Sequence, residues 1–136
     1  MPVTKDWSDK KILHVEDDLV CKYLLSELLT STNVSLTVCS NLIEARKRLT
    51  DDFDYDLVLL DILLPDGLGV KLCENIYNIN PDIPVIVNTA YYMSERDARL
   101  AVKFPNVKKV LMKPTSCEDI LDTISCYLDR PTYTTA

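Results

Sequence analysis

The stretch Ile12-Leu13-His14-Val15-Glu16-Asp17-Asp18 decides the fold, because a short run of mainly apolar residues leads directly into three acids. A run of this length and composition is typical of a buried strand. Three further runs also end in polar residues, namely 57–60 before Asp61, 85–87 before Asn88 and Thr89, and 107–112 before Lys113. Ligands bind outside the carboxyl ends of the strands in an open parallel sheet, so we expect these polar side chains to converge at one edge.

The composition indicates one globular domain that does not bind nucleic acid or membrane directly. The chain has 136 residues, of which 47% are hydrophobic and 26% are charged, which suits a single core. Its formal net charge of -6 argues against binding to a phosphate backbone, which requires clustered cations. No apolar stretch approaches the roughly 20 residues that are needed to span a bilayer.

The cysteines and the N-terminus predict a cytoplasmic protein. No secretory signal precedes the first apolar run, and the five cysteines form no CxxC pair. We therefore expect free thiols in a reducing compartment. A zinc site is not expected, because the single histidine, His14, lies within an apolar run.

Segments of helical periodicity alternate with the short runs, which predicts an α/β domain of five βα units around a parallel sheet. The predicted strands are 11–15, 34–38, 56–60, 84–88 and 107–112. The predicted helices are 19–31, 41–50, 69–79, a fourth that begins at Ser94, and 116–129. Residues 1–9 are interpreted as a lead-in, 10–129 as the domain and 130–136 as a tail.

Capping signals mark several helix starts. Asp18 is expected to cap the first helix, because a carboxylate before the first turn accepts hydrogen bonds from free backbone amides. Three later helices begin with a capping residue that is followed by an acid three positions on. These predicted pairs are Asn41 with Glu44, Ser94 with Asp97, and Thr115 with Glu118.

Crowded carboxylates at the expected edge of the sheet indicate a divalent metal ion. The acidic triplet 16–18 alone is also explained by the dipole of the helix that follows it. Asp61 adds a further acid directly after a buried strand, with Pro65 and Gly69 at offsets of four and eight in the turn that follows. Burying several carboxylates together is costly without a cation, so we expect a hard, oxygen-binding ion such as Mg²⁺.

The ordered set of motifs resembles the receiver domain of two-component response regulators over about residues 10–129. The motifs are residues 12–18, Asp61 with Pro65 and Gly69, Thr89-Ala90, and Lys113-Pro114. The resemblance implies a doubly wound (βα)5 sandwich whose parallel strands have the flavodoxin-like order 2-1-3-4-5. It also implies phosphorelay signalling, in which a sensor histidine kinase or a histidine phosphotransfer protein is the phosphoryl donor.

The resemblance implies roles for the residues that match the family motifs. Asp61 is the implied phosphoacceptor, and Thr89 and Lys113 are the implied ligands of the phosphoryl oxygens. The bond between Lys113 and Pro114 is a candidate cis peptide. The domain is not a conventional enzyme in this reading, but it catalyses its own phosphorylation.

The implied cofactor is Mg²⁺, which neutralises charge during phosphoryl transfer. Its implied ligands are the carboxylates of Asp17 and Asp61, the backbone carbonyl of Leu63, and Glu16 through a metal-bound water.

Two departures from the family pattern concern switching and phosphoryl lifetime. Val110 stands where receivers carry Tyr or Phe, three residues before the lysine, and a valine lacks the rotameric swing of an aromatic ring. Tyr91 or Tyr92 is the alternative switch residue. Leu63 and Tyr91 occupy the positions that flank the path of the hydrolytic water, and a leucine cannot orient that water, so we expect slow autodephosphorylation.

Three functions follow from these residues. The first is a phosphorylatable switch that acts on an unidentified downstream protein, or on a second copy of the chain, through the fourth and fifth helices and the fifth strand. The second is a Mg²⁺-dependent phosphohydrolase with Asp61 as nucleophile, which is disfavoured because Leu63 supplies no second acid. The third is an interaction module that is never phosphorylated, as Val110 suggests.

Overall fold

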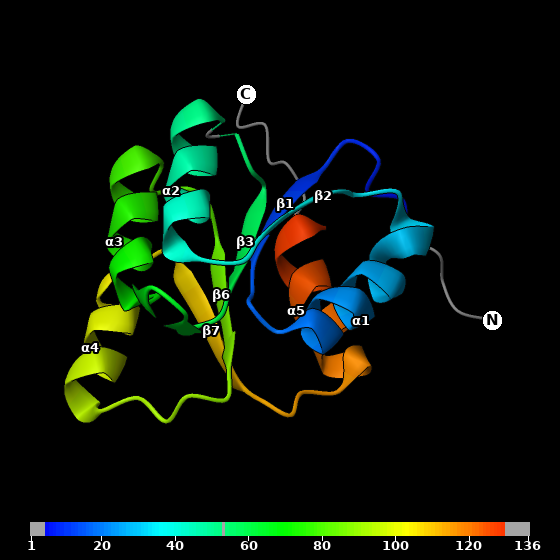
Figure 1. The fold of residues 1–136 in the computed structure, drawn as a ribbon. Coiled ribbons are helices and arrows are strands. Elements are labelled where there is room, and N and C mark those ends of the chain that lie inside the picture. The colour runs from blue at the N-terminus through cyan, green and yellow to red at the C-terminus, as the bar shows by residue number, and fades with distance from the viewer. Residues whose placement is uncertain (1–4, 53, 130–136) are drawn as a thin grey trace.

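A five-stranded parallel sheet with the order β2-β1-β3-β6-β7 forms the centre of the molecule, in a computed structural model that describes residues 5–52 and 54–129 (Figure 1). The strands are β1 (Lys11–Val15), β2 (Ser35–Cys39), β3 (Leu57–Leu60), β6 (Val85–Thr89) and β7 (Val107–Met112). Because β6 and β7 are the fourth and fifth strands of this sheet, the predicted order 2-1-3-4-5 is confirmed. The predicted bounds of β2 and β6 are one residue too early at both ends, and the predicted start of β3 is one residue too early.

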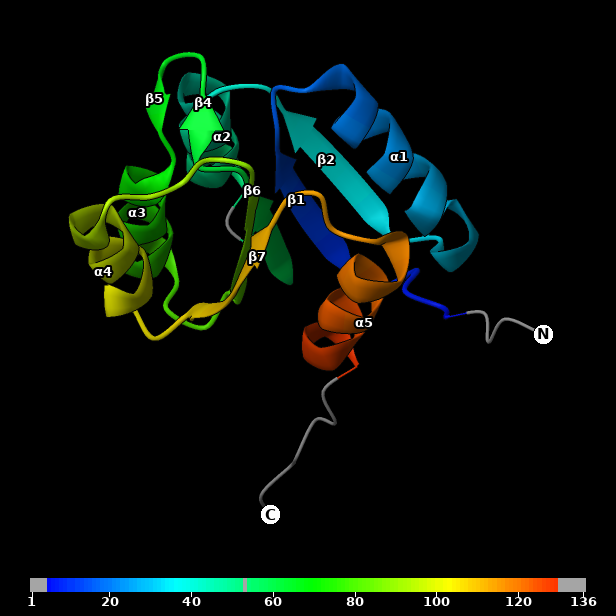
Figure 2. The same cartoon turned by 90° about the horizontal axis from the view of Figure 1, so that it is seen from below.

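Helices cover both faces of the sheet. Figures 1 and 2 show α1 and α5 on one face and α2, α3 and α4 on the other. The helices are α1 (Leu19–Leu29), α2 (Leu42–Asp51), α3 (Val70–Ile79), α4 (Glu95–Lys103) and α5 (Cys117–Leu128). The first helix is shorter than predicted because a 3-10 turn at Thr30–Thr32 follows it and Asn33 adopts a left-handed φ of 62°. No helix within the described ranges is long and apolar enough to cross a membrane.

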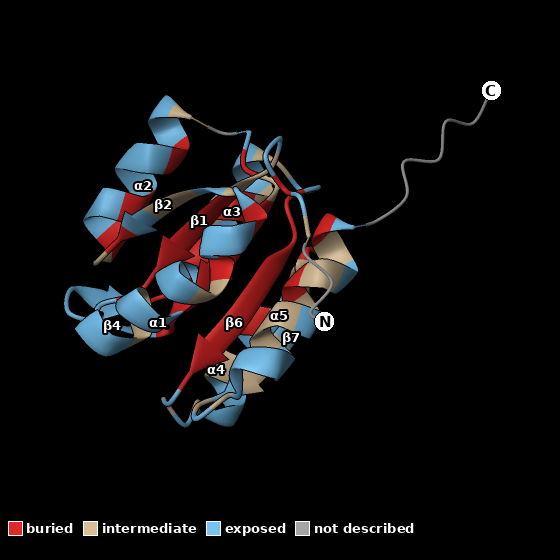
Figure 3. Cartoon of the chain, turned by 90° about the vertical axis from the view of Figure 1, so that its right-hand side faces the viewer, coloured by how far each residue is buried: buried red, intermediate tan, exposed pale blue. Residues whose placement is uncertain are grey.

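The alternation of side chains along each strand builds two cores, one on each face of the sheet. In β1, Leu13 and Val15 pack in the core under α2, α3 and α4, whereas Ile12 packs in the core under α1 and α5. The central strands are buried on both faces, as Figure 3 shows for β1 and β6. Such strands are expected to read as nearly continuous apolar runs, and these do.

Most helix starts agree with the sequence. The Asn41 side chain accepts a hydrogen bond from the Glu44 amide at 2.8 Å, and Ser94 accepts one from the Asp97 amide at 3.1 Å. Asp18 accepts from two amides in the first turn of α1, as predicted.

The predicted pair of Thr115 and Glu118 is wrong. Ser116 caps α5 instead, and its hydroxyl accepts from the Asp119 amide at 3.0 Å. Thr115 is occupied elsewhere, because its hydroxyl donates to the Asn88 side chain at 2.7 Å. A tertiary hydrogen bond therefore removes Thr115 from the cap.

A short hairpin after β3 was not predicted. It pairs β4 (Leu63–Leu64) with β5 (Gly67–Leu68), and Gly67 has a φ of 145°, a conformation that favours glycine. Asp66 at the turn accepts hydrogen bonds from the amides of Leu42 and Ile43, at 2.8 and 3.1 Å. The hairpin thus supplies a second cap to α2.

The segment interpreted as a lead-in contributes to the core. Trp7 is 2% exposed and packs in the cluster beneath α1 and α5. Its indole N–H donates to the Asp129 carboxylate at 2.7 Å, and its backbone amide donates to the Thr32 carbonyl at 2.7 Å. The segment therefore ties the end of α1 to the end of α5. The predicted tail at 130–136 lies outside the described residues.

His14 is a buried polar residue of β1. It is 3% exposed, and its Nδ1 has no hydrogen-bond partner among the described residues. Burial, aided by the positive charge of Lys113, lowers the pKa of His14 from 6.5 to about 4. The imidazole is therefore neutral at pH 7.

Replacing Trp7 tests whether the N-terminal segment belongs to the folded core. We expect Trp7→Ala to lower the free energy of unfolding by about 3–5 kcal/mol, because it empties a fully packed site. Trp7→Phe keeps an aromatic ring at the site but removes the hydrogen bond to Asp129. It should therefore lower the free energy of unfolding by about 1 kcal/mol beyond any loss of packing. Urea unfolding followed by circular dichroism measures both, with Tyr92→Ala as an exposed control. A loss below about 1 kcal/mol in Trp7→Ala would contradict the packing role.

Burial of neutral His14 also predicts a pH dependence. Between pH 6.5 and 4 the unfolded chain binds a proton at this imidazole and the folded chain does not, so the free energy of unfolding falls as the pH is lowered through this window. The contribution is roughly 3 kcal/mol at most. We expect His14→Gln to be less sensitive to pH across the same window in urea unfolding. Parallel curves for the two proteins would exclude the effect.

Candidate functional site

The edge of the sheet at the carboxyl ends of the strands gathers the polar residues that the sequence singles out. Strand register places the ends of β1, β3 and β6 side by side, since Val15 pairs with Leu60 and Leu60 pairs with Val87. The residues that end or directly follow these strands and β7 therefore meet at one edge. They are Glu16, Asp61, Thr89 and Lys113.

Asp61 is the centre of this cluster. It is 8% exposed, and its Oδ1 accepts hydrogen bonds from the Thr89 hydroxyl at 2.6 Å and the Leu63 amide at 3.1 Å. Its Oδ2 accepts from the Lys113 ammonium at 3.1 Å. Thr89 is completely buried, so its hydroxyl is fixed toward the carboxylate. Both carboxylate oxygens are thus oriented by donors from different elements.

Lys113 pairs with two carboxylates at once. Its Nζ lies 2.6 Å from Glu16 Oε1 and 3.1 Å from Asp61 Oδ2. Its backbone amide donates to the Thr89 carbonyl at 2.8 Å, which anchors the lysine to the end of β6. The peptide bond between Lys113 and Pro114 is cis, as expected from the sequence.

Burial and hydrogen bonding shift the pKa values of Asp61 and Glu16 in opposite directions. Burial raises the pKa of Asp61, but the hydrogen bonds from the Thr89 hydroxyl and the Lys113 ammonium outweigh it and hold the pKa below its ordinary value. Burial, with the nearby charge of Asp61, raises the pKa of Glu16 despite its bond to Lys113. The two carboxylates raise the pKa of Lys113 in spite of its partial burial. Asp61 is therefore the more acidic of the two carboxylates.

A hollow of about 240 Å³ opens beside Asp61. Asp17 and Leu63 are exposed residues of its lining, and Tyr91 is a half-buried one. Ala90 of the Thr89-Ala90 motif also lines it, and so does Cys21, which was not predicted because a lone cysteine does not mark a site.

The expected metal ligands share this hollow. Within residues 5–52 and 54–129, no three His, Cys, Asp or Glu side chains lie close enough together to enclose a metal ion. The Lys113 ammonium pairs with both Glu16 and Asp61. The donor chemistry nonetheless suits a hard divalent cation, since the carboxylates of Glu16, Asp17 and Asp61 outnumber the one ammonium.

Gly69 is required by close packing against the backbone of Asp61. A Cβ at position 69 would lie 2.5 Å from the Asp61 carbonyl oxygen, which no side chain can accept. The Gly69 amide also donates to the Ile62 carbonyl at 2.6 Å. The glycine at an offset of eight therefore lets the chain pass directly beneath the site, while Pro65 lies in the hairpin turn.

Val110 is not among the residues that line the hollow beside Asp61. It is half-buried and packs against the core under α2, α3 and α4. Tyr91 also packs against this core and its backbone amide donates to the Thr89 hydroxyl at 3.0 Å, whereas Tyr92 is 89% exposed. Tyr91 is thus bonded to the threonine through its backbone, while its side chain packs on the core.

Comparisons with known proteins agree with this geometry. The chain is 33% identical to the Regulator of RpoS from Escherichia coli (strain K12) over 113 residues, which are 82% of this chain and 32% of that protein. It superposes on the crystal structure of a CheY-like response regulator receiver domain protein from Methanospirillum hungatei with a TM-score of 0.81 and 27% identity, covering 88% and 94% of the two chains. The beryllofluoride-activated NtrC4 receiver domain dimer matches with a TM-score of 0.75 and 30% identity, covering 88% and 96%.

The chain spans only part of its curated relatives, for example 51% of the response regulator MprA from Mycobacterium leprae and 11% of the two-component response regulator ORR22 from Oryza sativa. Its residues 12–125 match the family model of the response regulator receiver domain, which is most of the chain. The strand order, the acidic edge and this match lead to one conclusion: the chain belongs to the receiver domain family of two-component response regulators.

Proposed function

We propose that Asp61 is the phosphoacceptor of this receiver domain and takes a phosphoryl group from a phosphohistidine. The observation that carries the proposal is the set of donors on the Asp61 carboxylate, which come from Thr89, Lys113 and the Leu63 amide. The donor protein is a sensor histidine kinase or a histidine phosphotransfer protein. The proposed receiver domain extends over residues 10–129. The domain and its phosphoryl donor would act in the cytoplasm.

The transfer step follows from the chemistry of the carboxylate. One Asp61 oxygen attacks phosphorus, a P–O bond forms as the P–N bond to the imidazole breaks, and the electron pair returns to the imidazole nitrogen, which takes up a proton. Ionised Asp61 needs no general base for this attack. Thr89 and Lys113, which already bind its oxygens, would then bind the oxygens of the phosphoryl group.

Mg²⁺ is the proposed cofactor. Asp17, Asp61 and the Leu63 carbonyl would hold it, with Glu16 acting through water, and the ion would neutralise charge on the transferring group. Four carboxylates line one hollow with a single ammonium among them, and three of the four, Glu16, Asp17 and Asp61, belong to this set.

Phosphorylation would switch the contacts of α4, β7 and α5 with a downstream protein or a second copy of the chain. The activated NtrC4 receiver domain is itself a dimer, which supports the second partner. Because Val110 replaces the usual aromatic residue, Tyr91 is the proposed switch residue beside Thr89. The acidic chain is not proposed to bind nucleic acid or membrane directly.

Phosphorylation by acetyl phosphate tests the acceptor. With Mg²⁺ present, we expect intact mass spectrometry to show a gain of one phosphoryl group that is absent from Asp61→Asn. Asp82→Asn, an exposed acid outside the site, is the matched control and should be labelled as well as the parent. Chelation of Mg²⁺ should abolish the gain. Equal labelling of Asp61→Asn would refute the assignment.

The lifetime of the phosphoryl group tests the roles of Leu63 and Tyr91. The exposed Leu63 side chain cannot orient a hydrolytic water and the Tyr91 ring lines the same hollow, so we expect the phosphorylated domain to persist for minutes or longer. Leu63→Gln should shorten this lifetime severalfold, whereas Ile43→Gln, on the exposed side of α2, should not. Decay of the labelled mass measures both. A lifetime of seconds in the parent would count against shielding.

A further inference from the structure

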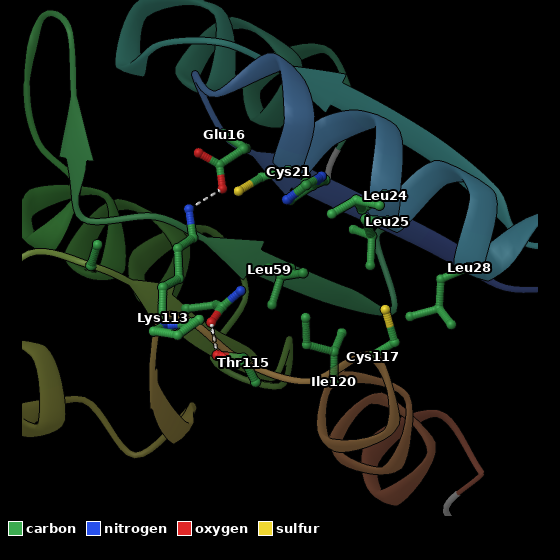
Figure 4. A pocket seen from close by; sticks show the side chains of 14 residues that line it. Glu16, Cys21, Leu24, Leu25, Leu28, Leu59, Lys113, Thr115, Cys117 and Ile120 are labelled. Atoms are coloured by element: carbon green, nitrogen blue, oxygen red, sulfur yellow. Dashed lines mark hydrogen bonds and ion pairs between the residues drawn. The ribbon is translucent and has the colours of Figure 1, made fainter.

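A second, larger hollow lies between α1 and α5, next to the phosphoacceptor site. It has a volume of about 340 Å³, within the range of small-molecule sites (Figure 4). His14 of β1, Leu59 of β3 and Asn88 of β6 line it from the sheet, because they lie on the strand face that packs toward α1 and α5. Apolar side chains of the two helices complete the walls. They are Leu24, Leu25, Leu28 and Ile120.

The sheet side of the hollow offers hydrogen-bond donors that have no partner. The Nδ1 of the buried His14 is sealed and unpaired among the described residues. An unpaired buried N–H is costlier than an unpaired acceptor, so the proton of the neutral imidazole belongs on Nε2. The Asn88 oxygen accepts from Thr115, while its NH₂ group makes no hydrogen bond within the described ranges. A ligand in this hollow would therefore meet donors and require an acceptor.

The charges at the polar end of the hollow select a neutral ligand. Glu16 and Lys113 line both this hollow and the one beside Asp61. The ammonium already pairs with the carboxylates of Glu16 and Asp61, so no positive charge remains for an anion. A carboxylate ligand would meet excess negative charge, whereas a neutral carbonyl would not.

We propose that the hollow between α1 and α5 binds a small, neutral, mainly apolar molecule whose carbonyl oxygen accepts hydrogen bonds from His14 and Asn88. The leucines and Ile120 would bury its apolar body. Binding requires no phosphoryl group, so the proposal is independent of the role of Asp61.

Three matched compounds test the proposal on the unphosphorylated protein: 2-acetylnaphthalene, 2-ethylnaphthalene and 2-naphthoate. They share a ring system. The acetyl group is a neutral hydrogen-bond acceptor, the ethyl group is no acceptor, and the carboxylate is a charged acceptor. We expect the acetyl compound to shift the amide signals of Leu24, Leu28 and Ile120 saturably in ¹H–¹⁵N NMR titrations. The ethyl compound should bind about 25-fold more weakly, because it lacks two hydrogen bonds that are each worth about fivefold, and the naphthoate at least as weakly.

Two cysteines of α5 provide a matched pair of variants. Cys117 lines the hollow at the start of the helix and is exposed, whereas Cys126 is exposed on the same helix but outside the hollow. We expect Cys117→Trp to fill the entrance and weaken binding of 2-acetylnaphthalene at least tenfold. Cys126→Trp should bind within twofold of the parent.

Two results would overturn the proposal. Equal affinity for the three compounds would show that no donor in the hollow forms a hydrogen bond with the carbonyl oxygen. Unsaturable shifts, or shifts confined to residues that do not line the hollow, would show that the hollow is not a binding site. The comparison of compounds uses the parent protein alone, so it remains decisive even if Cys117→Trp fails to fold.

Discussion

The ion pair of Lys113 with Glu16 and Asp61 is the interaction on which the site depends. Glu16 is almost fully buried and Asp61 nearly so, and burying two acids together is unfavourable unless a cation compensates them. The lysine lies 97 residues from Glu16 and 52 from Asp61 in the sequence. The pair therefore forms only when the whole sheet has closed, and it links correct folding to an ionised Asp61.

Main-chain hydrogen bonds fix the positions of the residues that form this ion pair. Glu16, Asp61 and Lys113 each follow a strand, and each is held by a main-chain hydrogen bond to the end of a neighbouring strand. The Glu16 amide donates to Cys39, the Asp61 amide to Val15, and the Lys113 amide to Thr89, at 2.8 to 2.9 Å. Sites on rigid elements are more exact than sites on loops. The exposed Asp17 has no comparable main-chain tie among the described residues, which suits its proposed role as a metal ligand.

Local patterns predicted most of the fold, and tertiary contacts decided what they missed. Thr115 and Ser116 each precede an acid by three residues, so the sequence alone offers two equivalent caps, and only the bond to Asn88 excludes Thr115. The β4–β5 hairpin is too short to show an alternating period. Trp7 carries no periodic signal either, because its partner Asp129 lies at the other end of the domain. The acids and Lys113 were predictable since each directly follows an apolar run.

The same geometry explains why the two hollows adjoin. Residues that alternate along β1 point to opposite faces, so His14 faces α1 and α5 while its neighbours Leu13 and Val15 enter the other core. At the end of the strand, Glu16 and Lys113 reach the boundary between the acidic hollow and the apolar one and line both. A change in the charge at Asp61 alters the pairing of Lys113 and hence the polar end of the apolar hollow. Coupling between two sites is reciprocal. A molecule that binds the apolar hollow more tightly in one pairing state of Lys113 therefore also shifts the equilibrium between charge states at Asp61.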